Sequence, residues 1–150
     1  MLADTLPELK NLEKIFLGSG VVCYDLTAFE NCNQIEELWI SNNFVENIDG
    51  IEGMKKLRIL DISDNLVQDI SELNEVENLE AVCLTGTPIE NLEVLLELPS
   101  LKVVCYETEK KEQKEILETL EEKGVIVDSD REKFAETMKQ AGIDSIGDVR

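Results

Sequence analysis

The sequence predicts an α/β solenoid in which short parallel strands stack along a concave face and short helical or irregular segments return along the convex face. Two observations predict this fold. A strand-like pattern, L-x-x-L-x-L, recurs along the chain, and three further columns of apolar residues recur in phase with it. Repetition at a fixed period of a few tens of residues is the signature of stacked units that share one continuous core.

The strand pattern occurs five times, as LEKIFL from Leu12, IEELWI from Ile35, LRILDI from Leu57, LEAVCL from Leu79 and LKVVCY from Leu101. Successive copies start 23, 22, 22 and 22 residues apart, with the extra residue in the first loop. Because neighbouring strand residues point to opposite faces, Leu38 and Ile40 are expected inside and Trp39 outside. Each strand should pair in parallel with its equivalent in the next repeat, about 4.8 Å away.

The apolar columns between the strands predict the inner side of the convex layer. They comprise Leu26, Ile48, Ile70 and Leu92, then Phe29, Ile51, Leu73 and Leu95, then Cys32, Met54, Val76 and Leu98. Leu6 and Leu9 continue the second and third columns ahead of the first strand. These segments are short and contain glycine, so we expect 3₁₀ or irregular turns in them.

Asn43 and Asn65 occupy the same position after their strands, where the backbone turns outward. A buried peptide group without a partner costs ~1–3 kcal/mol, and an amide side chain can satisfy several such groups. We therefore predict a structural role for both asparagines.

Residues 107–142 are predicted to form a helical cap after repeats spanning 1–106, followed by a tail over 143–150. KKEQKEILETLEEKG indicates a helix that buries Ile116, Leu117 and Leu120 and stops at Gly124. Residues 125–127 are predicted to add a further strand, since Ile126 follows Val104 by 22 positions.

A last helix is expected from Asp130 to about Ala141, with Ser129 and Glu132 as a capping box. Phe134 and Met138 lie four residues apart and should therefore share one face of this helix. We expect this face to pack on the end of the solenoid.

The segment ELWISNNFVENIDGIEGMKKLRILDISDN, residues 37–65, resembles leucine-rich repeats of the 22-residue subfamily. Members include the leucine-rich-repeat regulatory subunit of protein phosphatase 1, the leucine-rich-repeat light chain of axonemal dynein and the bacterial internalins. The similarity covers about residues 6–106 and concerns the framework. It implies a protein-binding role, but the residues with which those members bind their partners cannot be carried over to this chain.

The outward strand positions form the concave face, and they suggest where a partner binds. The predicted partner-binding residues are Phe16, Trp39, Ile59, Asp61, Cys83, Val103, Cys105, Lys14 and Glu37. Trp39 and Phe16 lie side by side as expected anchors, because exposed apolar patches mark interaction sites and aromatic residues dominate interface energetics. Lys14, Glu37, Arg58 and Asp61 would form the polar rim. The alternatives are that the C-terminal helices cover part of this surface, or that β-propensity alone explains its composition.

Cys83 and Cys105 share a column on neighbouring strands. A disulfide between them is conceivable because Cα atoms of neighbouring strands lie near 5 Å apart. Two reduced thiols are the favoured interpretation, since bridges between parallel strands are rare and a cytoplasmic location is expected.

Composition argues against several other functions. The chain has 33 acidic against 14 basic residues, a net charge of −19, and such charge repels nucleic acid and anionic membranes. It has no apolar run long enough to span a membrane and no recognisable signal peptide. The absence of histidine removes a Cys/His zinc site and the commonest general base. We expect no cofactor, no metal and no small-molecule substrate.

The predicted function is a non-catalytic protein-interaction module, an adaptor or regulatory scaffold that binds a protein partner through the concave face. Two alternatives stay open. One is a bacterial surface or secreted recognition module of internalin type, and the other is a spacer fragment of a longer repeat protein.

Overall fold

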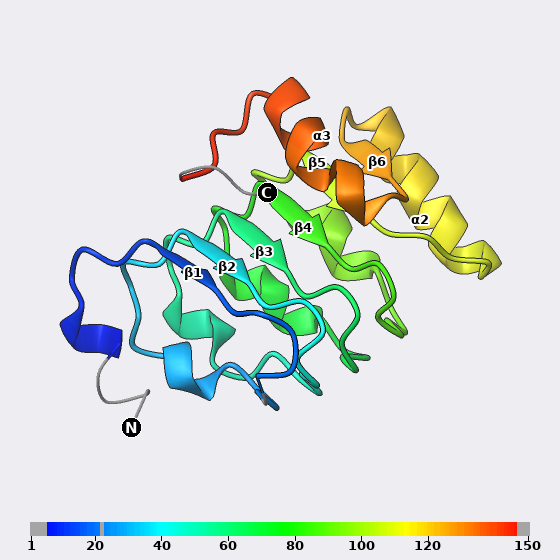
Figure 1. Cartoon of the computed structure of the whole chain (residues 1–150). Coiled ribbons are helices and arrows are strands. Elements are labelled where there is room, and N and C mark those ends of the chain that lie inside the picture. The colour runs from blue at the N-terminus through cyan, green and yellow to red at the C-terminus, as the bar shows by residue number, and fades with distance from the viewer. Residues whose placement is uncertain (1–5, 22, 147–150) are drawn as a thin grey trace.

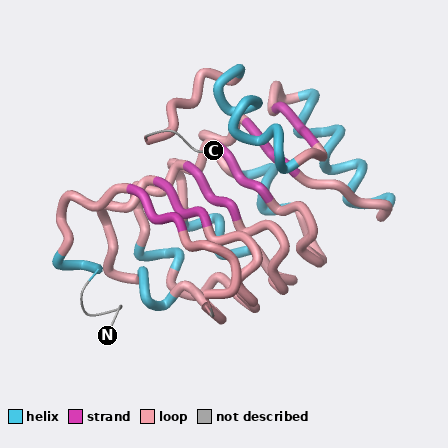
Figure 2. The backbone as a smooth tube through the Cα atoms, viewed as in Figure 1, coloured by secondary structure: helices cyan, strands magenta, loops and turns pink. Residues whose placement is uncertain are grey.

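The computed structural model describes residues 6–21 and 23–146, and in this part of the chain six short strands form one parallel sheet (Figures 1 and 2). The strands are β1 (Lys14–Phe16), β2 (Glu37–Trp39), β3 (Ile59–Asp61), β4 (Ala81–Cys83), β5 (Val103–Cys105) and β6 (Ile126–Asp128). Their spatial order follows the sequence, as expected for a solenoid in which each unit contacts only its neighbours.

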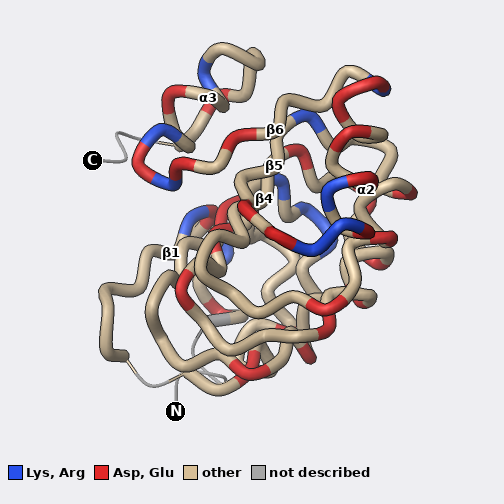
Figure 3. Tube along the Cα trace, turned by 90° about the vertical axis from the view of Figure 1, so that its right-hand side faces the viewer, with Lys and Arg blue, Asp and Glu red and all other residues tan. Residues whose placement is uncertain are grey.

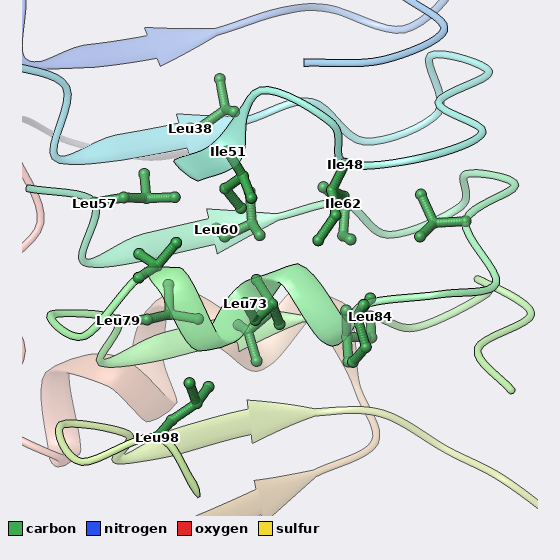
Figure 4. Close-up of a cluster of buried hydrophobic side chains, with 14 of the residues drawn as sticks. Leu38, Ile48, Ile51, Leu57, Leu60, Ile62, Leu73, Leu79, Leu84 and Leu98 are labelled. Atoms are coloured by element: carbon green, nitrogen blue, oxygen red, sulfur yellow. The ribbon is translucent and has the colours of Figure 1, made fainter. Parts of the chain in front are cut away.

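The strand register confirms the predicted stacking of the interior. Leu38 pairs with Leu60, and Leu60 pairs with Val82. All three side chains are fully buried in the main core between the sheet and the convex layer. Figure 4 shows Leu38 and Leu60 within this core. A single repeat could not cover such a face, so the core exists only through stacking.

The convex side consists of short 3₁₀ helices, as predicted. They are η2 (Thr27–Phe29), η3 (Ile51–Gly53), η4 (Ser71–Glu75) and η5 (Glu93–Glu97). All twelve residues of the three apolar columns are buried. Glycine permits the close stacking of neighbouring turns, because a Cβ built on Gly53 would lie 1.5 Å from the carbonyl oxygen of Glu30.

Asn65 joins three consecutive repeats through hydrogen bonds. Its Oδ1 accepts from the backbone N–H groups of Asn43 at 3.0 Å and Val45 at 2.9 Å. Its Nδ2 donates to the carbonyls of Ile40, Ile62 and Ser63. In the next repeat the hydroxyl of Thr87 accepts from the Asn65 N–H and donates to the Ile62 carbonyl.

The first repeat is less well covered than the column pattern predicts. Its upstream turn is η1 (Leu6–Glu8), and Leu9 remains 47% exposed in the described part of the chain. The packing predicted for the Leu6 side chain lies outside what the structure describes.

The C-terminal cap consists of α2 (Lys111–Glu122), β6, η6 (Arg131–Lys133) and α3 (Phe134–Gln140). Helix α2 buries Leu117 and Leu120 and half-buries Ile116, and it ends before Gly124, which has a φ of +94°. Strand β6 lies one residue later than predicted, so that Val104 pairs with Val127 and not with Ile126.

The start of the last helix also differs from the prediction. Residues 131–133 form a 3₁₀ turn, and α3 begins only at Phe134. The N-cap is Asp130, whose carboxylate accepts from the Glu132 N–H at 2.9 Å, in place of the expected capping box between Ser129 and Glu132. The last four residues of the predicted tail, 147–150, lie outside the described residues.

None of the helices in the described ranges is long and apolar enough to cross a membrane.

Candidate functional site

The concave face of the sheet is partly covered by the chain's own C-terminal segment. We call residues 131–146 the C-terminal cover. Phe134, Met138 and Ile143 of the cover pack on a second apolar cluster, separate from the main core. On the sheet side this cluster contains Trp39, Ile59, Ala81, Cys83, Val103 and Cys105. Figure 1 shows α3 beside the sheet, with the chain then running back over it toward β1.

Most of the side chains predicted to face solvent on this surface are therefore buried, and that part of the prediction is wrong. Ile59, Cys83, Val103 and Cys105 have no exposed surface, and Trp39 is only 4% exposed. They occupy the concave face as expected. The cover, however, supplies the apolar surface that a partner was expected to supply, which is the alternative left open above.

Arg131 fastens the start of the cover to the sheet. Its guanidinium lies 2.8 Å from the Asp61 carboxylate, which is 1% exposed. It also donates to the hydroxyls of Ser63 at 2.7 Å and Ser41 at 2.9 Å. Asp61 in turn accepts from the Ser63 hydroxyl, so the buried carboxylate has a full set of partners.

Glu37 fastens the other end of the cover. This carboxylate is fully buried and accepts from the Ser145 hydroxyl at 2.7 Å and from the backbone N–H of Ile146. Lys14 lies 3.6 Å from the same carboxylate and donates to the Ile146 carbonyl at 2.7 Å. Two predicted rim residues therefore hold the chain's own backbone.

Trp39 lies between the two fastened ends. Its indole N–H donates to Glu37 at 3.0 Å, and its ring meets Phe134 edge-on with centroids 5.7 Å apart. The ammonium of Lys14 lies 5.6 Å from the indole centroid, within the range of a cation–π contact.

Phe16 is the one predicted anchor that remains open to solvent in the described residues, with 56% of its surface exposed. Beside it lies a pocket of about 280 Å³. The pocket is lined by Phe16, Trp39, Asp61, Arg131, Glu132, Phe134 and Ala135. This open part of the concave face has an apolar base and a charged edge.

Arg58 lies apart from this pocket, on the edge where the strands begin. Its guanidinium bridges Glu36 and Glu80, each at 2.9 Å, and donates to the Asp144 carbonyl. Burial lowers the pKa of Arg58, but the hydrogen bonds that its guanidinium donates to both carboxylates outweigh this effect and hold the pKa above its ordinary value. Arg58 therefore ties neighbouring repeats and the cover together.

The described residues contain no group of three or more Cys, Asp or Glu side chains arranged to hold a metal ion. The four cysteines all lie in the described part, and their thiols are free.

Arg131 was not predicted as part of this surface, and covering by the C-terminal helices was predicted only as an alternative. The sequence did offer one indication of the cover. The outward strand positions are apolar, and the last helix also has an apolar face that needs a surface to pack on. Nothing in the repeat period, however, indicates where that helix docks.

Residues 33–75 match the protein family described as Leucine Rich repeats (2 copies). The matched range contains β2, η3, β3 and η4, the most regular part of the solenoid. Residues 33–75 are leucine-rich repeats. The resemblance inferred from residues 37–65 is thereby confirmed.

Solved structures share the leucine-rich-repeat fold of this chain. An internalin from Listeria monocytogenes matches with a TM-score of 0.67 and 20% identity, over 83% of this chain and 36% of its own length. Internalin C2 of the same organism matches with a TM-score of 0.59 and 27% identity, over 68% of this chain and 45% of its own. The chain thus spans less than half of either protein. The comparison with curated proteins yields no match.

Proposed function

We propose that this leucine-rich-repeat protein is a non-catalytic protein-interaction module that binds a partner through the open part of its concave face. The observation that carries the proposal is Phe16, a large aromatic side chain that is 56% exposed at the edge of a pocket. Aromatic anchors in such positions dominate interface energetics. The similarity to internalins supports the fold of this chain, and it does not indicate which partner the chain binds.

The pocket suggests what part of a partner it takes. Its volume of about 280 Å³ lies at the small end of ligand-sized cavities, so it suits one or two side chains better than a whole small molecule. Phe16, Trp39 and Phe134 supply apolar surface, and Glu132 adds a carboxylate to the edge. An apolar side chain flanked by basic residues fits this surface, because the net charge of −19 steers cations toward it.

The test compares Phe16→Ala with wild type in affinity capture from a lysate of the source organism, followed by quantitative mass spectrometry. A specific partner should be recovered less well by the variant. With the purified partner, calorimetry should show a loss of about 2 kcal/mol, roughly a 30-fold weaker Kd.

Leu66→Ala is the matched control, because Leu66 is similarly exposed but lies in the loop after β3. It should leave binding unchanged. A partner bound equally well by wild type and Phe16→Ala, with the variant folded by circular dichroism, would show that the open concave surface is not the binding site.

A further inference from the structure

Cys83 and Cys105 face each other across β4 and β5, beneath the C-terminal cover. They are direct register partners in the parallel sheet. Both are fully buried in the apolar cluster that Phe134, Met138 and Ile143 close. A buried thiol usually serves as a small apolar residue, but two thiols in register can also react with each other.

The geometry of this pair suits a disulfide. Register partners on neighbouring strands lie about 4.8 Å apart and point to the same face. A disulfide requires a Cα separation of about 4.4–6.8 Å, and neighbouring strands fall within this range. It also requires Cβ atoms about 3.5–4.5 Å apart, so the two strands must draw slightly together as the bond forms. Both cysteines are free thiols.

We propose that Cys83 and Cys105 are a redox-active pair that a peroxide oxidises to a disulfide when the C-terminal cover lifts from the sheet. The pair is a modification site in addition to the proposed binding surface, and it does not depend on that surface. The cover controls the reaction because it separates both sulfurs from solvent.

The cover is built to open locally. Helix α3 has seven residues, and an isolated helix of that length is not stable in water. The cover is held by three buried apolar side chains and by polar contacts at its two ends, through Arg131, whose own side chain is 38% exposed, and through the bonds of Ser145 and Ile146 to Glu37. Terminal elements of this kind open at a lower free energy than the whole domain.

The two thiols have different roles. The Cys105 thiol can donate a hydrogen bond to the Cys83 sulfur, which lowers the pKa of Cys83 despite its burial. The Thr85 hydroxyl lies 3.4 Å from the same sulfur and acts in the same direction. The pKa of Cys105 is raised, because it gives up that hydrogen bond and would ionise beside an existing thiolate. The contact with the Thr85 hydroxyl distinguishes the Cys83 sulfur from that of Cys105, so we assign Cys83 as the attacking thiolate and Cys105 as the resolving thiol.

The reaction proceeds in two steps. The Cys83 thiolate attacks one oxygen of hydrogen peroxide, the O–O bond breaks, and the departing hydroxide takes up a proton to become water, which leaves a sulfenic acid on Cys83. The Cys105 sulfur then attacks the Cys83 sulfur, the S–O bond breaks, and a second water leaves with the proton of the Cys105 thiol. One peroxide is reduced to two waters, and two thiols are oxidised to one disulfide.

The experiment treats the folded protein with hydrogen peroxide, alkylates the remaining thiols and maps the peptides without reduction. Trypsin cuts after Arg58, Lys102 and Lys110, so the two cysteines fall in separate peptides, 59–102 and 103–110. We expect these peptides to become linked. The link should disappear in Cys83→Ser and Cys105→Ser and persist in Cys23→Ser, the matched control at a cysteine outside the pair.

A variant that loosens the cover tests its role. Arg131→Gln should speed the appearance of the linked peptides roughly tenfold, because it frees the first fastening point. An equal rate in wild type and Arg131→Gln would overturn the role of the cover.

Two results with wild type would overturn the pair itself, whether or not the variants fold. In one, peptides 59–102 and 103–110 stay separate while the same peroxide treatment oxidises the thiols of the urea-unfolded chain. In the other, the link joins two molecules and appears as a covalent dimer on a non-reducing gel.

Discussion

Asn65 carries an unusual share of the repeat's internal hydrogen bonding for a single side chain. It accepts from two backbone N–H groups and donates to three carbonyls, and all of these bonds are buried. Asn43 has the equivalent position in the preceding repeat. It donates to the carbonyls of Ser41 and Leu17, but its Oδ1 has no partner among the described residues.

This difference predicts unequal effects of one substitution at two equivalent positions. Asn65→Leu should lower the free energy of unfolding by about 3 kcal/mol, because it leaves the N–H groups of Asn43 and Val45 buried without partners. Asn43→Leu should cost about 1 kcal/mol, since it removes fewer bonds and also an unsatisfied oxygen. Urea unfolding followed by circular dichroism measures both values. Equal losses would show that volume, and not hydrogen bonding, governs this position.

The two residues expected to act together on the concave face have different environments. Phe16 and Trp39 are register partners on β1 and β2, as their sequence positions predict. Trp39 is sealed by Phe134, whereas Phe16 lies beyond the reach of α3 and stays exposed. Their strand positions are equivalent, so the strand pattern alone could not separate them.

At the scale of elements, α3 and the residues after it determine how much of the sheet remains available. The cover is fastened at Asp61 through Arg131 and at Glu37 through Ser145 and the Ile146 N–H. Between these points it relies on apolar packing. A change at either fastening point should therefore alter the exposure of Trp39.

Arg131→Gln tests this coupling through fluorescence, since the chain contains one tryptophan. Removing the guanidinium leaves the Asp61 carboxylate buried without its counter-ion. The pair is partly exposed, so the cost should be below the ~3–5 kcal/mol of a fully buried pair. We expect the Trp39 emission to shift to longer wavelength and acrylamide quenching to increase.

Lys133→Gln provides the control from the same turn. Lys133 forms an exposed ion pair with Asp130 at 4.0 Å, which should contribute little. The Trp39 emission spectrum of Lys133→Gln should match that of wild type. An Arg131→Gln spectrum that also matches wild type would mean that apolar packing alone holds the cover.

At the scale of the whole molecule, crowding of carboxylates opposes folding. Figure 3 shows acidic positions along the loops of the repeats and on α2, consistent with the net charge of −19. Glu72 illustrates the effect, because desolvation, then Asp49 and other nearby carboxylates, raise its pKa to about 7. This group favours the folded state when protonated, so its contribution to stability is lost as the pH rises from 4.5 through about 7.

Screening should therefore stabilise the protein at pH 8, where its carboxylates are charged. Raising NaCl from about 10 mM to about 0.5 M should increase the Tm by roughly 5 °C, because the Debye length falls from ~30 Å to a few ångström and repulsion weakens. Differential scanning calorimetry measures the shift. The increase should be smaller at pH 5, and a lower Tm at high salt would show that attractive ion pairs such as Arg58 with Glu80 dominate instead.

The sequence alone determined the repeat register, the inward column through Leu38, Leu60 and Val82, and the buried convex columns. Inside and outside alternate along a strand with a fixed local period, so each repeat carries this information within itself. The short 3₁₀ turns of the convex side were also predictable, because the segments between strands are short and contain glycine.

Only the tertiary structure decided which part of the concave face meets solvent. Arg131 reaches Asp61 across 70 positions of sequence, and Ile146 reaches Glu37 across 109. The repeat period predicts neither of these long-range contacts, because residues 131–146 lie outside the repeats. Their docking depends on complementary shape, charge and apolar surface. Trp39 was therefore predictable as a concave residue and not as a covered one, whereas Phe16 stays open because α3 does not extend to β1.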